Sequence, residues 1–179
     1  MHMATEARPW TLEEVHRLPD DGNKYELVRG ELFVTPAPSV DHETIIARLA
    51  RLFEPYVAAN QLGLVYRPRA VLRFEGSEVE PDLMVRQPPS ERRLTWEHVS
   101  VPVLVIEVLS PYTRRRDRGP KRDFYMDAGV GEYWIVDPDD ESVTIVRRGD
   151  DNVTARDQVA WLPSDGLTPL VVPLAEIFR

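Results

Sequence analysis

Residues 101–109 read VPVLVIEVL, the most apolar run of the chain, and Ser110-Pro111 follow it directly. A short run that is rich in β-branched residues and ends at turn residues is typical of a central β-strand buried on both faces. Glu107 interrupts this run with a carboxylate. Because an ionised carboxylate is costly to bury without partners, we expect Glu107 to be paired, metal-bound or protonated. A buried ion pair, for example with an arginine, is the alternative to a metal site.

The segments around this strand alternate between hairpins and helices. Residues 25–28 and 31–35 are predicted as two strands joined at Arg29-Gly30. Residues 40–60 are predicted as a helix capped by Ser39, because their apolar residues recur at spacings near 3.6. The other expected elements are a short helix at 11–17, strands at 64–66, 70–74 and 79–85, a helix at 117–128, strands at 132–136 and 142–146, and a last helical turn at 174–177. Strand–helix–strand units mixed with hairpins predict an α/β fold with a mixed sheet flanked by helices.

The length and composition bound the organisation of the chain. Its 179 residues fit a single domain spanning 1–179, with a helical extension at 1–22, a core at about 25–146, and short strands and a helix at 147–179. The absence of cysteine excludes disulfides and thiolate chemistry and fits a reducing cytoplasm. No apolar run approaches the roughly 20 residues of a membrane helix. Since the first residues also lack the pattern of a signal peptide, we expect a cytoplasmic protein without membrane contact.

Asp82 is the second carboxylate of interest. It follows Pro81, which cannot donate to a β-ladder and so marks the beginning of a strand. An aspartate at the start of one strand and a glutamate within its neighbour can meet at the same end of a sheet. Two converging carboxylates make an oxygen-rich site that suits Mg²⁺ or Mn²⁺. A solvated turn aspartate is the alternative for Asp82.

Lys121 lies on the helix that is expected after the Glu107 strand. It shares one helix face with Phe124, Tyr125 and Ala128 by i, i+3, i+4 spacing. This face predicts that the lysine points toward the protein, where its ammonium could hold a phosphate or orient an attacking water. An ordinary surface lysine is the alternative.

A basic cluster surrounds Lys121. Five arginines fall within nine positions, namely Arg114, Arg115, Arg116, Arg118 and Arg122. Arginine forks match phosphate oxygens, and basic residues near a helix start oppose the helix dipole, so stability alone does not favour them there. The net charge of −8 argues against a protein that coats nucleic acid with its whole surface, but it permits one basic cleft. We therefore expect phosphate contacts, with pairing to nearby acids as the alternative.

Several motifs together resemble the Uma-two family of restriction endonucleases, which belongs to the PD-(D/E)XK nuclease superfamily. The motifs are Pro81-Asp82, Glu107-Val108-Leu109-Ser110-Pro111, the stretch 114–121 with Tyr125, Gly129-Val130, residues 132–137, and an N-terminal block at 25–32 and 36–42. The resemblance runs from about Tyr25 to Val146, and its string from Glu107 to Asp137 is specific.

The resemblance implies a restriction-endonuclease-like fold with a metal site. Asp82 and Glu107 would be the carboxylate ligands, and the Val108 carbonyl would complete the set. Leu109 stands where the superfamily has a lysine, and the resemblance moves that role to Lys121. The N-terminal block supplies weaker candidates for the rim of the cleft: Glu26 and Glu31 as catalytic residues and His42 as a phosphate contact.

The expected function is that of an endonuclease that hydrolyses DNA phosphodiester bonds with Mg²⁺ or Mn²⁺. A homodimer is expected because superfamily nucleases that cut duplex DNA often pair. The alternative is a non-catalytic nucleic-acid-binding or assembly module that retains the fold, which Leu109 and the acidic net charge favour. A metal hydrolase acting on a small phosphoester is the third hypothesis, and the basic cluster argues against it.

Overall fold

The computed structural model describes residues 8–88, 95–96 and 99–179. Twelve strands and five helices form within this part of the chain. In chain order they are α1 (Leu12–Val15), β1 (Lys24–Val28), β2 (Glu31–Thr35), α2 (Val40–Ala59), β3 (Leu64–Tyr66), β4 (Leu72–Phe74), β5 (Ser77–Val79), β6 (Leu83–Arg86), β7 (Leu104–Val108), α3 (Arg114–Arg118), α4 (Pro120–Asp127), β8 (Glu132–Asp137), β9 (Ser142–Val146), β10 (Val153–Ala155), β11 (Gln158–Trp161), β12 (Leu170–Pro173) and α5 (Ala175–Phe178).

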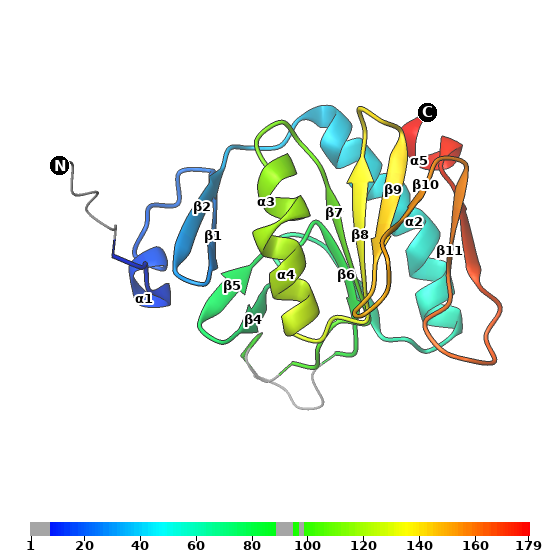
Figure 1. Ribbon diagram of the computed structural model, residues 1–179, viewed down its shortest axis with the longest axis horizontal. Coiled ribbons are helices and arrows are strands. Elements are labelled where there is room, and N and C mark those ends of the chain that lie inside the picture. Colours follow the sequence, from blue (N-terminus) through cyan, green and yellow to red (C-terminus); the bar gives the residue numbers. More distant parts are fainter. Residues whose placement is uncertain (1–7, 89–94, 97–98) are drawn as a thin grey trace.

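A six-stranded mixed sheet forms the centre of the fold, with the strand order β10-β9-β8-β7-β6-β3. β7 and β8 are parallel, whereas the other neighbours are antiparallel. Every residue of β7 is buried, as its apolar sequence predicts for a central strand. Figure 1 shows α3 and α4 across one face of this sheet and α2 across the other. The predicted α/β fold with a mixed sheet flanked by helices is therefore confirmed.

A second sheet of four strands, in the order β2-β1-β5-β4, lies beside α3 and α4 (Figure 1). β1 and β2 form the predicted hairpin, and its turn residues Arg29 and Gly30 have positive φ angles of 51° and 84°. Tight two-residue hairpin turns require this conformation, which glycine adopts without steric cost. The remaining pair, β11 and β12, forms a small separate sheet near α2.

Two predicted elements are each divided in the structure. The prediction of one strand at 79–85 is wrong, because β5 ends at Val79 and β6 begins at Leu83 in a different sheet. Pro81 lies in this break, where its missing N–H leaves no gap in a ladder. The prediction of a single helix at 117–128 is also wrong, because α3 ends at Arg118 and α4 begins at Pro120. Gly119 lies outside the helical region, with φ −122° and ψ −102°, and Pro120 begins α4 as a proline at a helix start can.

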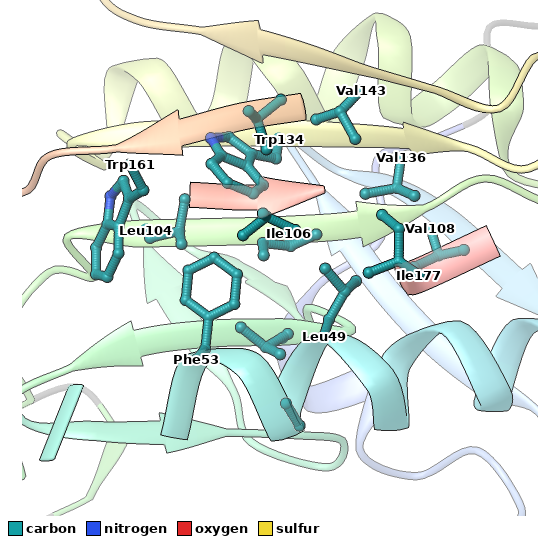
Figure 2. Close-up of a cluster of buried hydrophobic side chains, with 14 of the residues drawn as sticks. Leu49, Phe53, Leu104, Ile106, Val108, Trp134, Val136, Val143, Trp161 and Ile177 are labelled. Carbon is teal, nitrogen blue, oxygen red and sulfur yellow. The ribbon is translucent and has the colours of Figure 1, made fainter. Parts of the chain in front are cut away.

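The face of the large sheet toward α2 buries an apolar core. Leu49 and Phe53 of α2 pack against alternate residues of β7, and Phe53 makes tilted and edge contacts with Trp161 and Trp134 at 5.4 and 5.5 Å between ring centroids (Figure 2). The 3.6-residue spacing of α2 produces this buried stripe, as predicted. No described helix combines the length and apolar character that crossing a membrane requires.

Candidate active site

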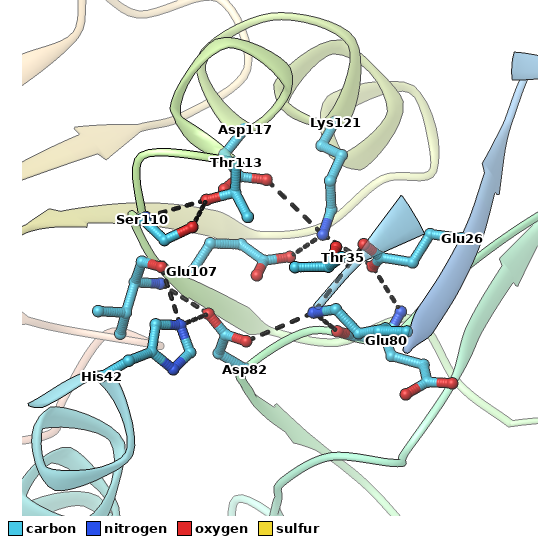
Figure 3. Close-up of polar contacts among 12 residues, drawn as sticks. Glu26, Thr35, His42, Glu80, Asp82, Glu107, Ser110, Thr113, Asp117 and Lys121 are labelled. Atoms are coloured by element: carbon cyan, nitrogen blue, oxygen red, sulfur yellow. Dashed lines mark hydrogen bonds and ion pairs between the residues drawn. The ribbon is translucent and has the colours of Figure 1, made fainter. Parts of the chain in front are cut away.

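Two carboxylates meet where β6 and β7 lie side by side. Leu83 pairs with Ile106 in the antiparallel register, so the preceding Asp82 lies opposite Glu107. Asp82 is 5% exposed and Glu107 is 2% exposed, and both line a cavity of about 340 Å³. Figure 3 shows the two side chains pointing toward one another from adjacent strands. The break between β5 and β6 thus serves to bring Asp82 to the central strand.

The two carboxyl groups have opposite pKa shifts. Burial raises the pKa of Glu107 to about 8, while Lys121 opposes the rise and Asp82 adds to it. Burial also disfavours the charged form of Asp82, but the charges of Lys24 and His42 outweigh it and hold the pKa well below its usual range. Charged Asp82 thus lies beside a carboxyl group whose charged form is disfavoured by burial. Such a separation of neighbouring pKa values is typical of sites that perform acid–base chemistry.

Lys121 reaches this pair from α4. Its Nζ atom lies 2.6 Å from Glu107 Oε1 and 2.8 Å from Glu26 Oε1, and the side chain is fully buried (Figure 3). Burial lowers its pKa, but the surrounding carboxylates outweigh burial and raise it above the ordinary lysine value. Tyr125, one turn further along α4, donates its hydroxyl to the same Glu107 oxygen. The shared helix face predicted from the sequence therefore lies inward, with the ammonium held as a cation.

β1 adds a second lysine and a third carboxylate to the site. Lys24 Nζ lies 3.5 Å from Asp82 Oδ1, donates to the Glu80 carbonyl at 3.1 Å, and lines the cavity. Glu26 is fully buried, and although burial opposes its ionisation, Lys121, Lys24 and Arg116 lower its pKa to about 2. Glu26 had been expected at the rim of the cleft, whereas Lys24 had not been expected at all. The hairpin sequence gives no signal for Lys24, because pairing of β1 with β5 sets its position.

His42, in the first turn of α2, contacts two of the expected metal ligands. Its Nε2 atom lies 3.0 Å from the Val108 carbonyl oxygen and 3.2 Å from Asp82 Oδ2. The same Asp82 oxygen accepts a 2.9 Å hydrogen bond from Val108 N–H. Burial lowers the pKa of His42, but its hydrogen bond to Asp82 and the charge of that carboxylate raise it overall. The ring thus fixes the Asp82 carboxylate against the end of β7.

The five arginines of the basic cluster do not share one environment. Arg116 alone turns inward; it is 7% exposed, lines the cavity, donates to Thr35 and lies 3.4 Å from Glu26 Oε2. The others lie outside the cavity lining: Arg114 and Arg118 pair with Asp137, Arg122 pairs with Asp123, and Arg115 is exposed. Pairing with acids, the alternative to phosphate contacts, therefore describes four of the five, since Arg116 also pairs with Glu26. Glu31 also lies apart, exposed at the first position of β2.

The donor set suits a hard divalent cation. Asp82 and Glu107 offer carboxylate oxygens, the Val108 carbonyl oxygen lies beside them, and oxygen ligands are those that Mg²⁺ and Mn²⁺ prefer. Among the described residues, no three His, Asp or Glu side chains already form a metal-binding group. Because the Nε2 atom of His42 already contacts the Val108 carbonyl oxygen and Asp82 Oδ2, an ion bound to both would compete with the imidazole ring there. The residues fit such an ion in chemical type and in their position on the cavity wall.

Comparisons with known proteins identify the family and a shared fold. A family model described as "Putative restriction endonuclease" (Uma2) matches residues 12–175. An uncharacterized protein of Synechocystis sp. is 27% identical over 131 residues, which cover 72% of this chain and 68% of that protein. A crystal structure from Anabaena variabilis, titled as that of a "putative nuclease belonging to DUF820", is similar with a TM-score of 0.77 and 19% identity over 95% of this chain and 98% of that one. This likeness shows that the two chains share a fold.

Proposed function

Because the chain belongs to the Uma2 family, whose model matches residues 12–175, we propose that it is a nuclease that hydrolyses DNA phosphodiester bonds with Mg²⁺ or Mn²⁺. The resemblance seen in the sequence and the restriction-endonuclease-like fold are both confirmed. The observation that carries the proposal is the meeting of Asp82, Glu107 and Lys121 at one end of the central strand. The cytoplasmic location and the homodimer stay predictions.

The proposed metal ligands are Asp82, Glu107 and the Val108 carbonyl. A divalent ion held there would polarise a phosphate and lower the pKa of a bound water. The charge of the cavity lining supports this dependence on a cation. The lining has five carboxyl groups, Glu43, Glu80, Asp82, Glu107 and Asp117, against the cations Lys24, Arg69 and Arg116. The lining thus has more carboxyl groups than lysine and arginine cations, and an added divalent ion would help to hold an anionic phosphate there.

Lys121 serves as a fixed cation in this proposal. Since its pKa is raised, the ammonium keeps its protons at neutral pH and cannot act as a general base. It can donate hydrogen bonds to an attacking water or to the phosphate in the transition state, where preorganised donors lower the barrier. Leu109, which stands at the superfamily's lysine position, is buried among apolar residues that include Phe124 and Tyr133. The 2.6 Å approach of Lys121 to Glu107 supports the transfer of the lysine's role to α4.

Lys24 and Arg116 are the proposed phosphate contacts within the cavity. Both side chains line the cavity. Both also form ion pairs with Glu26, whose negative charge holds their cationic groups in place. The Arg116 Nε atom is buried without a hydrogen-bond partner among the described residues and lies 3.7 Å from Asp117 Oδ1. For the outer arginines Arg114, Arg115, Arg118 and Arg122, contact with more distant phosphates stays a prediction.

The rival function is a binding module that retains the fold without catalysis. Leu109 and the surplus of carboxylates in the lining are the observations that favour it. The two proposals differ in what metal binding does: the nuclease cleaves DNA when Mn²⁺ is added, whereas the module binds DNA and leaves it intact.

Calorimetric titration with Mn²⁺, followed by cleavage of a fluorescent oligonucleotide, tests the proposal. We expect the wild-type protein to bind Mn²⁺ and cleave, and Asp82→Asn to lose both. Asp139→Asn is the matched control, because Asp139 is 79% exposed and lies outside the cavity lining. Unchanged Mn²⁺ binding in Asp82→Asn would contradict the assigned ligand. Binding of Mn²⁺ and DNA without any cleavage would favour the rival module.

A further inference from the structure

The cavity beside the carboxylates has a wall with no role in the chemistry proposed so far. Its lining includes Asp82, Glu107 and the phosphate contacts. The lining also includes apolar and ring-bearing residues, namely Pro36, Ala37, Pro38, Pro68, Pro111 and Tyr112. Proline side chains have no rotamer freedom to lose, so this wall offers a rigid apolar surface to a ligand. A bare metal ion and a phosphate leave that surface unused.

Tyr112 is the most exposed large side chain of this wall. It is 74% exposed although it lines a cavity, and no described aromatic ring stacks on it. The turn that carries it is fixed, because Ser110 N–H donates to Thr113 Oγ1 at 3.0 Å and Thr113 N–H donates back to the Ser110 carbonyl at 3.2 Å. An exposed ring on a fixed turn can stack on a planar ligand at little cost in conformational entropy.

The depth of the reactive groups limits what can reach them. Asp82, Glu107 and Lys121 are 5%, 2% and 0% exposed, so a scissile phosphate has to move below the surface to meet them. In a base-paired duplex, each phosphate belongs to a continuous helical backbone. It cannot move away from the path of that backbone unless the duplex is distorted. An unpaired nucleotide can bend inward. The cavity volume of about 340 Å³ is near the lower end of ligand pockets, about 300–1,000 Å³, which suits one small ligand unit.

We infer that the substrate enters as an unpaired nucleotide, with its base stacked on Tyr112 and its phosphate directed toward Asp82 and Glu107. The inference rests on the proposed nuclease function and specifies its substrate class as single-stranded DNA or unpaired segments of a duplex. The proline wall holds the sugar and base, and Lys24 and Arg116 hold the phosphate. Stacking of this kind is tolerant of sequence, because every base has an aromatic face.

Binding and cleavage of three oligonucleotides with one common sequence test this inference: a single strand, a blunt duplex, and a duplex with an unpaired extension. Fluorescence anisotropy of the wild-type protein in Ca²⁺, in place of the catalytic ion, measures binding, and the wild-type protein in Mn²⁺ measures cleavage. We expect tight binding of the single strand and the extension, cleavage within the unpaired part, and weak binding of the blunt duplex. Tyr112→Ala is expected to weaken single-strand binding about 5- to 150-fold.

Two further variants separate stacking from general effects. Tyr112→Phe keeps the ring and is expected to bind the single strand as the parent does. Trp10→Ala removes an aromatic residue that is 41% exposed and lies outside the cavity lining, and it is expected to change nothing.

The failure of this inference and that of the nuclease proposal give different results. Equal binding and cleavage of all three DNAs, unaffected by Tyr112→Ala, would overturn the inference and leave the nuclease standing. Single-strand binding that depends on Tyr112, without cleavage of any DNA by the wild-type protein, would support the binding site and overturn the nuclease. Absence of both binding and cleavage would overturn both.

Discussion

The two faces of the central sheet bury different sets of side chains, although the same strands supply them: one face buries an apolar core, and the other combines an apolar cluster with buried charged groups. Toward α2, Leu104, Ile106 and Val108 of β7 pack into a core of aliphatic and aromatic residues (Figure 2). Toward α4, the same strand presents Val105 and Glu107, and Glu107 meets buried charged groups (Figure 3). Alternation along a strand makes such a division available to any sheet, so only the choice of residues differs between the faces.

The apolar face stabilises the fold, whereas the face with the buried charges is specialised. Apolar burial contributes stability roughly in proportion to its area. Buried ion pairs contribute much less, because removing two charges from water costs nearly as much as their attraction returns. A fold selected for stability alone has no reason to bury Glu26, Glu107 and Lys121 together. We therefore interpret the face toward α4 as the functional one.

Of the substitutions proposed for the two faces, replacing Lys121 should reduce stability and cleavage the most. Lys121→Met leaves Glu26 and Glu107 buried without their shared cation, and removal of one partner from a buried pair costs about 3–5 kcal/mol. We expect urea unfolding to show a loss of that size and the cleavage assay to show no activity. Lys121→Arg tests whether charge alone suffices, and it should not, because a guanidinium is too large for this buried position. Unchanged stability in Lys121→Met would mean that the cluster is solvated and the comparison of faces is wrong.

Lowering the pH should reduce the stability that the charged face contributes before it affects the apolar face. The pKa of Glu26 is lowered to about 2, so its charged form stabilises the folded state. This contribution, on the order of 3 kcal/mol, is present above the ordinary glutamate pKa near 4.3 and is lost as the pH falls toward 2.

Glu26→Gln tests this dependence by urea unfolding at a series of pH values. We expect the variant to be less stable than the wild type at pH 7, and the difference in free energy of unfolding to shrink between pH 5 and pH 2. Glu13→Gln is the control, because Glu13 is exposed and its ion pair with Arg17 lies on the surface. A difference that is constant across this range would contradict the low pKa of Glu26.

The sequence predicted those features of the two sheet faces that local patterns determine. Glu107 stands out because a carboxylate falls within an apolar strand, and Lys121 because it shares a helix face with Phe124 and Tyr125. The hairpin of β1 and β2 and the amphipathic α2 follow from local periodicity and turn residues in the same way.

The remaining features depend on long-range contacts. Lys24 reaches Asp82 only because β1 pairs with β5, and nothing near Lys24 in the sequence encodes that pairing. The inward turn of Arg116 among outward-facing arginines likewise depends on Glu26 and Thr35, more than 80 residues earlier in the chain. By contrast, the break at Gly119-Pro120 had a local signal, since this pair is typical of a helix boundary.

A small change on the apolar face should have the smallest effect. Ile106 precedes Glu107 in β7 and points to the opposite side, so Ile106→Val removes one methylene from the core without touching the site. The expected cost is about 0.5–1.5 kcal/mol in thermal or urea unfolding, with unchanged Mn²⁺ binding and cleavage. A loss of cleavage beyond the loss of folded protein would show that the two faces are coupled.

Nicking of supercoiled plasmid, in Mg²⁺, Mn²⁺ or EDTA, tests the central claim most directly, since such plasmids contain transiently unpaired segments. Glu107→Gln is compared with Glu132→Gln, a second buried glutamate at the start of β8 that pairs with Arg147 and lies outside the cavity lining. We predict metal-dependent nicking by the wild type and by Glu132→Gln, and none by Glu107→Gln. Equal nicking by Glu107→Gln, or nicking that persists in EDTA, would contradict the assignment of a metal-dependent nuclease site to the charged face.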